Sequence, residues 1–303
     1  MRVMVTGAGG MLADAVAALL EKRGDESLGV YFSDAEAEAM RGRFPHGVAF
    51  EFGRAGAGDG ALAPFEEAVS GFRPEWIFHL AAWTDVDGCE SDRARAVRSN
   101  ADACFEAGRV AERHGARLLL ISTDYVFDGL AARPYGEDDR TGPPSIYGQS
   151  KLAGETFVRA SGVEYVVVRT AWLYGAGGRH FVDTIRARLE AGQPVRIVND
   201  QRGCPTLTTD LALALRTLAE RDARGIVNVV NSGDATWFEL ALEIARSMGR
   251  EHLVSPISTE ELNRPAPRPR YSVLNTSRYA SLAGAPLPDW RDALGRYLAL
   301  RTN

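Results

Sequence analysis

The sequence predicts an α/β protein built around a doubly wound parallel sheet. Three observations predict this fold class. Short apolar runs alternate with longer helical patterns through the first half of the chain. These runs are continuous in Val, Ile and Leu, as expected of strands that are covered on both faces. A glycine-rich turn at residues 7–10 separates the first apolar run from the first helical pattern.

The elements of the first half follow from this alternation. Strands are expected at residues 2–6, 28–32, 48–52, 76–80, 117–122 and 164–169. Helical patterns include residues 11–23, 92–114 and 145–160. Because strand–helix–strand units cross over with a right hand, this order places helices on both faces of the sheet.

The rhythm becomes less regular after Gly175. Helices are expected at residues 181–191, 209–221 and 237–248, and strands at 195–198 and 226–230. Three prolines within residues 264–270 exclude a helix or a central strand there, so an extended loop with three arginines is expected. We predict a first domain at residues 1–175, which also receives part of 200–235, and a smaller interleaved C-terminal α/β lobe at 176–303.

The bulk composition excludes several classes of protein. The chain has 303 residues, enough for two lobes, and a formal charge of −5 with scattered arginines, so no nucleic-acid partner is expected. No apolar stretch approaches the roughly 20 residues of a membrane span, and strand-like sequence begins at once, without room for a leader. The three cysteines show no Cys-x-x-Cys spacing, so neither disulfides nor a metal site is expected. These features predict a cytoplasmic protein.

The glycine-rich turn predicts a dinucleotide site. Gly7, Gly10 and Ala13 follow the first strand and open the first helix, where a diphosphate can approach backbone amides. An acid at the end of the second strand usually binds the ribose of NAD, but Ser33 takes that place here and Asp34 follows it. Because a neutral hydroxyl tolerates a 2′-phosphate, NADPH is slightly favoured over NADH.

A tyrosine and a lysine form a candidate acid/base pair. The chain has two lysines, Lys22 and Lys151, among 35 basic residues, and Lys151 follows Tyr147 by four positions, which places them on one helix face. Arginine does not replace lysine where a compact ammonium is needed. The ammonium is expected to lower the pKa of the Tyr147 phenol. The alternative is a helical Tyr and Lys with unrelated surface roles.

Two hydroxyl residues, Ser122 and Thr123, end the strand expected at 117–122. Ligands of open α/β sheets bind beyond the carboxyl ends of the strands. A hydroxyl that holds a carbonyl oxygen, a phenol that donates a proton and a nicotinamide that supplies hydride together suit carbonyl reduction. The alternative for Ser122 and Thr123 alone is a strand-end turn.

The motifs together resemble the dTDP-4-dehydrorhamnose reductase family of the extended short-chain dehydrogenase/reductase superfamily. The resemblance extends over nearly the whole chain, and STDYVFDG and RTAW are its most specific parts. Its landmarks are residues 5–12 (VTGAGGML), 81–87 (AAWTDVD), 122–129 (STDYVFDG), 147–155 (YGQSKLAGE), 169–175 (RTAWLYG), 200–206 (DQRGCPT) and 264–275.

The resemblance implies a Rossmann-type NAD(P)-binding domain, a sugar-nucleotide-binding lobe and reduction of the C4 ketone of dTDP-6-deoxy-L-lyxo-4-hexulose to dTDP-L-rhamnose. It implies that Tyr147 is the proton donor, Lys151 its partner and a nicotinamide-ribose ligand, and Thr123 the polarising hydroxyl. The cofactor residues would be Gly7, Gly10, Met11, Leu12, Ser33, Glu51, Phe52, Ala82, Trp83, Thr84, Tyr147 and Lys151. The substrate residues would be Thr123, Asp124, Trp172, Arg202 and Arg268, the two arginines on the diphosphate; each could instead form a surface salt bridge.

Three positions depart from the family pattern. His180 stands where asparagine is usual and is expected to be a polar loop residue, Asn228 replaces a frequent histidine, and Ala15 replaces an acid of metal-bridged dimers. A homodimer and the identity of the sugar therefore stay open. Two alternatives remain: a reductase of another NDP-4-keto-6-deoxyhexose, and a non-catalytic NADP-binding regulatory subunit that resembles that of methionine adenosyltransferase.

Overall fold

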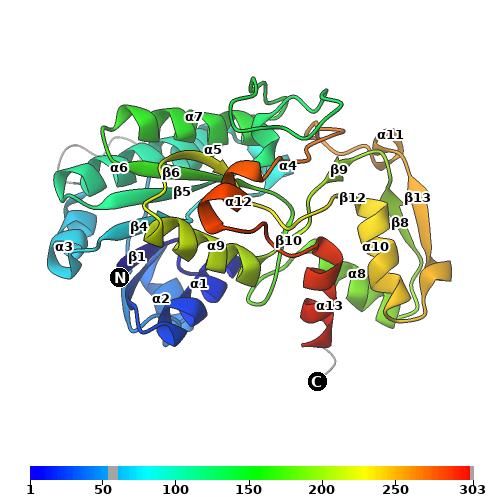
Figure 1. The fold of residues 1–303 in the computed structure, drawn as a ribbon, viewed down its shortest axis with the longest axis horizontal. Coiled ribbons are helices and arrows are strands. Elements are labelled where there is room, and N and C mark those ends of the chain that lie inside the picture. The colour runs from blue at the N-terminus through cyan, green and yellow to red at the C-terminus, as the bar shows by residue number, and fades with distance from the viewer. Residues whose placement is uncertain (54–60, 301–303) are drawn as a thin grey trace.

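The computed structural model describes residues 1–53 and 61–300. Its centre is a seven-stranded parallel sheet in the order β11-β6-β5-β4-β1-β2-β3 (Figure 1). The strands are β1 Arg2–Thr6, β2 Glu26–Tyr31, β3 His46–Ala49, β4 Trp76–His79, β5 Arg117–Thr123, β6 Tyr165–Thr170 and β11 Gly225–Asn228. The predicted fold class is confirmed. Because the order reverses between β1 and β4, a ligand crevice is expected at the carboxyl ends of these two strands.

Helices cover both faces of the sheet, as Figure 1 shows for α1 and α9 on one face and α6 and α7 on the other. Their bounds are α1 Met11–Lys22, α6 Ala103–Arg113, α7 Ile146–Ala160 and α9 Thr208–Glu220. Side chains of a strand alternate between faces, so Val3 and Val5 join the core under α1, and Met4 joins the core under α6. Full burial of each such side chain contributes about 1.5–3 kcal/mol.

The helix expected at residues 92–114 is not one regular helix. It consists of α5 Arg93–Val97, the π-helical turn η1 Arg98–Asp102 and α6. A π-turn inserts one residue into the helical ladder, and apolar periodicity did not reveal it. The strand expected at 48–52 lies slightly earlier, as β3, and the four residues Phe50–Gly53 lie outside it.

The second part of the chain builds a separate apolar core. This core joins α8 Phe181–Glu190, α10 Trp237–Arg246, α13 Trp290–Ala299 and the parallel pair β8 Val195–Val198 and β13 Val254–Ile257. Residues 208–228 lie with the first sheet instead, since α9 packs on α1 and β11 pairs with β6. The domain division at residue 175 stays a prediction.

Two further features concern the chain as a whole. Residues 264–270 contain neither helix nor strand, as the three prolines predicted. Within residues 1–53 and 61–300, none of the helices has both the length and the apolar character that crossing a membrane requires.

Candidate active site

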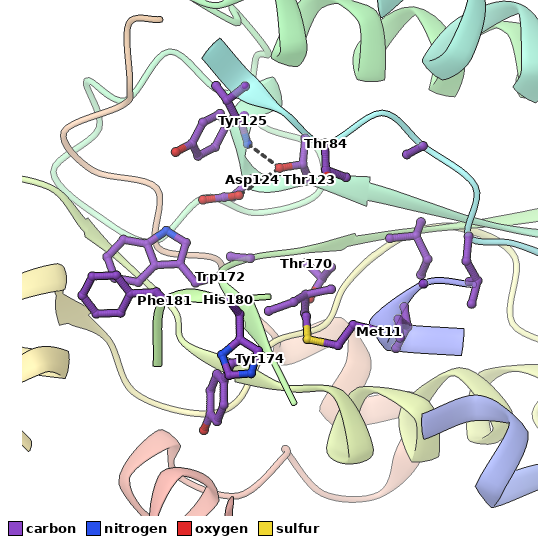
Figure 2. A pocket seen from close by; sticks show the side chains of 18 of the residues that line it. Met11, Thr84, Thr123, Asp124, Tyr125, Thr170, Trp172, Tyr174, His180 and Phe181 are labelled. Carbon is purple, nitrogen blue, oxygen red and sulfur yellow. Dashed lines mark hydrogen bonds between the residues drawn. The ribbon is translucent and has the colours of Figure 1, made fainter. Parts of the chain in front are cut away.

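One cleft spans the carboxyl ends of the sheet. A cavity of about 450 Å³ lies over β5 and β6 and extends to α8 and α10. A second cavity, of about 350 Å³, lies between the glycine loop and the end of β2. Because Gly7, Gly10, Leu80 and Ala82 line both, the two cavities adjoin at the strand-order reversal. Figure 2 shows Trp172 and Phe181 on one side of the cleft and Met11 on the other.

The glycine loop forms a cradle for a dinucleotide. Gly7 has φ +67°, and a Cβ there would lie 2.7 Å from the Ala81 backbone, so a side chain is excluded. Gly10 caps α1 without a side chain and its N–H donates to the Gly7 carbonyl at 2.9 Å. The N-terminus of α1 is therefore open to the cleft, where its amides and dipole favour an anion. Met11 and Leu12 line the cavity from this first turn.

The residues predicted to bind the adenosine side of the cofactor lie in two different places. Phe52, Ala82 and Trp83 line the second cavity, as expected for cofactor residues. The Ser33 hydroxyl instead caps α2 Asp34–Ala39 and accepts from the Glu36 N–H at 3.2 Å. Glu51 is exposed and lines a small hollow that adjoins the second cavity at Phe50. Ser33 and Glu51 therefore lie next to residues of the second cavity but do not themselves line it.

Glu36 is a residue of the second cavity that the sequence interpretation missed. Its Oε2 accepts a 2.7 Å hydrogen bond from the Phe32 N–H, just after β2. Its carboxylate also lies against the glycine loop, since a Cβ at Gly9 would collide with it. No motif marks Glu36, because the acid reaches the end of β2 only when α2 folds back.

The three catalytic candidates are together. Thr123, Tyr147 and Lys151 all line the first cavity, and Thr84 lies on the same wall. The Ser145 hydroxyl caps α7 by accepting from the Gly148 N–H at 3.2 Å, so Tyr147 and Lys151 lie one helical turn apart. Gly148 is required here because a Cβ would lie 2.3 Å from the Tyr125 carbonyl oxygen. This close approach sets α7 beside the end of β5.

The electrostatics of the pair differ from the prediction. Lys151 is 3% exposed and its Nζ donates to the Ile121 carbonyl oxygen at 2.7 Å. Burial lowers the pKa of the Lys151 ammonium and raises the pKa of the Tyr147 phenol, which a hydrogen bond with Thr123 only partly opposes. The expected lowering of the Tyr147 pKa is therefore wrong in this structure, because burial dominates and the ammonium is held on the strand.

Ser122 faces a buried ion pair. Its hydroxyl donates to Glu155 Oε1 at 2.5 Å, and the Arg169 guanidinium donates to both Glu155 oxygens at 2.9 and 2.7 Å. Ser122 thus anchors the end of β5 to this ion pair, although it lines the first cavity together with Thr123. The sequence interpretation placed both residues at the ligand edge, where both line the cavity, but it missed the hydrogen bond from Ser122 to Glu155.

The π-turn positions a buried amide beside the cleft. Asn100 Oδ1 accepts from the Trp83 N–H at 2.8 Å, and its Nδ2 donates to the Trp83 carbonyl and the Ser150 hydroxyl, each at 3.0 Å. Asn100 thus joins the Trp83 segment to α7, which carries Tyr147. π-Turns occur often at functional sites. No pattern in the sequence predicted this one.

Three buried polar atoms of the cavity wall make no hydrogen bond within the described parts of the chain. They belong to the wall residues Asp124 (Oδ2), Thr170 (Oγ1) and Tyr174 (Oη), of which the Tyr174 hydroxyl points away from the cleft (Figure 2). Buried polar atoms are almost always paired, so a polar ligand fits this wall. Burial raises the pKa of the Asp124 carboxyl to about 6. Its other oxygen, Oδ1, accepts from the Thr123 hydroxyl at 3.0 Å (Figure 2).

An aromatic stack closes the other side of the cavity. The Trp172 ring stacks on Trp237 with centroids 3.6 Å apart, and Phe181 packs beside it. Trp172 has φ +46°, an unusual conformation for a bulky residue, and a Cβ at Gly203 would lie 2.6 Å from its ring. The surroundings therefore fix the ring at the predicted site. Trp237 was not singled out from the sequence.

The two predicted diphosphate arginines lie outside the cavity-lining set. Arg202 pairs with Asp234 and Glu239, each at 3.0 Å, and Arg268 pairs with Asp87 at 3.1 Å. For both arginines, the structure therefore shows salt bridges, which were the alternative to binding a diphosphate. Their role in binding a diphosphate stays a prediction without support from this placement.

The three departures from the family pattern have structural roles. His180 is buried, caps α8 and lies 3.1 Å from the Tyr297 hydroxyl through Nε2. Asn228 Nδ2 donates to the carbonyl oxygens of Tyr135 and Asn275. Ala15 is buried under the sheet. His180 thus lies in the loop before α8, as expected, but it is buried there and its side chain caps the start of the helix.

The family model of the RmlD substrate binding domain matches residues 1–302. The chain belongs to this family. A dTDP-4-dehydrorhamnose reductase of Streptomyces griseus is 41% identical over 97% of this chain and 91% of its own length. A probable dTDP-4,6-dihydroxy-2-methyloxan-3-one 4-ketoreductase of Streptomyces antibioticus is 43% identical over 75% of this chain and 78% of its own.

A solved structure supports the same relationship. The dTDP-4-dehydrorhamnose reductase of Bacillus anthracis in complex with NADP has a TM-score of 0.84, 32% identity and 99% coverage of both chains. The resemblance to the dTDP-4-dehydrorhamnose reductase family, and with it the Rossmann-type fold, is confirmed.

Proposed function

We propose that this protein reduces the C4 ketone of dTDP-6-deoxy-L-lyxo-4-hexulose to dTDP-L-rhamnose, with NADPH or NADH as hydride donor. The observation that carries this proposal is that Thr123, Tyr147 and Lys151 line one cavity that adjoins the glycine cradle. The relative from Streptomyces griseus, named a dTDP-4-dehydrorhamnose reductase, supports the substrate.

The side chains suit acid catalysis at a ketone. A bound nicotinamide supplies the hydride. Thr123 holds the ketone oxygen, and Tyr147 donates its proton as the alkoxide develops. The raised pKa of Tyr147 keeps the phenol protonated, which is the form an acid needs. Lys151 is held by the Ile121 carbonyl in the same cavity, where its ammonium is placed to bind the nicotinamide ribose.

The sugar is held between the polar wall and the aromatic stack. The Asp124 carboxylate accepts hydrogen bonds from sugar hydroxyls, the Thr170 hydroxyl donates to or accepts from them, and the Trp172 ring packs on an apolar sugar face. These contacts, and not the catalytic set, distinguish one ketosugar from another. The three free, buried cysteines suit a reducing cytoplasm, and a homodimer remains compatible with the chain.

A reductase of another NDP-4-keto-6-deoxyhexose is the second candidate. The Streptomyces antibioticus relative is named a probable 4-ketoreductase of a different dTDP compound, and the same Thr123, Tyr147 and Lys151 would serve it. The regulatory-subunit alternative is disfavoured because all three groups meet in the cavity.

The test is an assay of the purified protein with two substrates, the L-lyxo ketosugar nucleotide and its epimer. NADPH oxidation measures the rate, and product analysis identifies the sugar that forms. Higher kcat/KM with the L-lyxo ketosugar and formation of dTDP-L-rhamnose support the proposal. Preference for the other ketosugar favours the second candidate, and NADPH binding without oxidation by either ketosugar favours a regulatory subunit.

A further inference from the structure

The cavity contains a cation that the sequence interpretation did not nominate. Among the residues that line the first cavity, the arginine and lysine side chains are Arg179 and Lys151. Lys151 is buried and bound to the Ile121 carbonyl. Arg179 is exposed at the rim, in the loop between β7 Leu173–Tyr174 and α8.

The loop that carries Arg179 packs against the first turn of α1. A Cβ at Gly177, which has φ +83°, would lie 3.0 Å from Asp14 Cγ, and a Cβ at Gly178 would lie 2.9 Å from Met11 Cβ. These glycines allow the loop to touch the end of α1 where the glycine cradle opens. Arg179 therefore reaches the cavity beside the first turn of α1, close to the glycine cradle.

The charge of Arg179 has no carboxylate partner in the described parts of the chain. Arg202 and Arg268, by contrast, are each bound by carboxylates outside the cavity wall. A planar guanidinium that lines the cavity and has no carboxylate partner among the described residues is suited to bidentate binding of phosphate oxygens.

We infer that Arg179 binds a nucleotide diphosphate in this cavity, in the role that the sequence suggested for Arg202 and Arg268. This inference rests on the proposed function, which brings two diphosphates to the cleft. One is the dinucleotide diphosphate at the start of α1, and the other is the diphosphate of the sugar nucleotide. Both offer the same ligand chemistry.

The experiment compares Arg179→Gln with the native protein in two fluorescence titrations, one with NADPH and one with dTDP. The matched control is Arg188→Gln, since Arg188 is exposed on α8 but does not line the cavity. We expect Arg179→Gln to raise the Kd for one of the two ligands about tenfold. The difference in Kd between this variant and the native protein should become smaller as salt is added. Arg188→Gln should leave both Kd values unchanged.

The two titrations separate the sources of the diphosphate. Weaker NADPH binding with unchanged dTDP binding assigns Arg179 to the cofactor, and the reverse assigns it to the substrate. Unchanged Kd for both ligands, or equal losses in the Arg188 control, overturns the inference. The titrations measure binding without turnover. If the protein binds both ligands but reduces neither ketosugar, the proposed function is refuted and the inference about Arg179 is not.

Discussion

Lys151 donates from Nζ to the carbonyl oxygen of Ile121 at 2.7 Å, which ties the helix that carries Tyr147 to the strand that carries Thr123. The ammonium is thus oriented by the backbone of β5. Its position depends on the length and compactness of the side chain, because Lys151 is almost completely buried.

The first prediction therefore concerns Lys151→Arg. The bulkier guanidinium should neither fit the buried space nor reproduce the hydrogen bond to Ile121, and kcat should fall at least about tenfold. Lys22→Arg is the matched control, since Lys22 is exposed at the end of α1. Steady-state kinetics of both variants measure the difference; full activity in Lys151→Arg would show that only the charge matters.

Tyr147→Phe removes the proton donor and leaves the ring. Because the phenol is the group placed to protonate the alkoxide, kcat should fall by roughly 100-fold or more. The Kd for NADPH should stay close to the native value, since the aromatic ring is kept. Turnover assays and fluorescence titration separate the two effects, and near-normal turnover would refute the assignment of Tyr147.

Asp124 should make stability depend on pH. Burial raises the pKa of its carboxyl from 3.8 to about 6, so the folded state binds this proton more tightly than the unfolded chain. The folded state therefore loses stability as the pH rises from about 4 through 6, by up to about 3 kcal/mol. Asp124→Asn cannot ionise and should escape this loss.

Urea unfolding of the native protein and Asp124→Asn, at about pH 4 and about pH 8, tests this sign. The variant should gain stability relative to the native protein at the higher pH. If the difference between the two proteins is the same at both pH values, Asp124 is not a buried acid of raised pKa.

Glu36 should discriminate against NADPH. Its carboxylate lies in the second cavity beside Gly9 and the end of β2, where the dinucleotide ribose is expected. A 2′-phosphate near this charge would be repelled. Glu36→Gln should therefore raise the ratio of kcat/KM for NADPH to that for NADH by about tenfold.

Glu38→Gln is the control for this substitution, because Glu38 is exposed on the same helix and pairs with Arg41. It should leave the cofactor ratio unchanged. If Glu36→Gln leaves the NADPH/NADH ratio of kcat/KM unchanged, the adenosine ribose does not lie beside Glu36. The slight preference for NADPH that Ser33 suggested would then be favoured again.

The parts of the site that could be predicted are those that a local pattern determines. Gly7 and Gly10 follow a strand and open a helix, and Tyr147 and Lys151 share a helix face by spacing alone. Thr123 could be placed because a buried strand must end at the ligand edge of a parallel sheet.

The residues that could not be predicted depend on partners far away in the chain. Arg202 is neutralised by Asp234 and Arg268 by Asp87, pairs that are 32 and 181 residues apart. The raised pKa of Tyr147 is a property of burial, which spacing does not report. Asn100 reaches Trp83 only because a π-turn offsets the helix, and nothing in its sequence marks that extra residue.

The scarcity of lysine has a practical consequence for handling the protein. Of its two lysines, Lys151 is enclosed in the cleft and Lys22 is exposed at the end of α1. The N-terminal amine is held by Asp25 at 2.8 Å. Amine-directed dyes or resins should therefore attach chiefly at Lys22, which lies at the opposite end of α1 from Gly10 and the cleft. Attachment at Lys22 would hold the protein on a sensor surface chiefly in one orientation, with the nucleotide entrance left open, because Lys151 is buried.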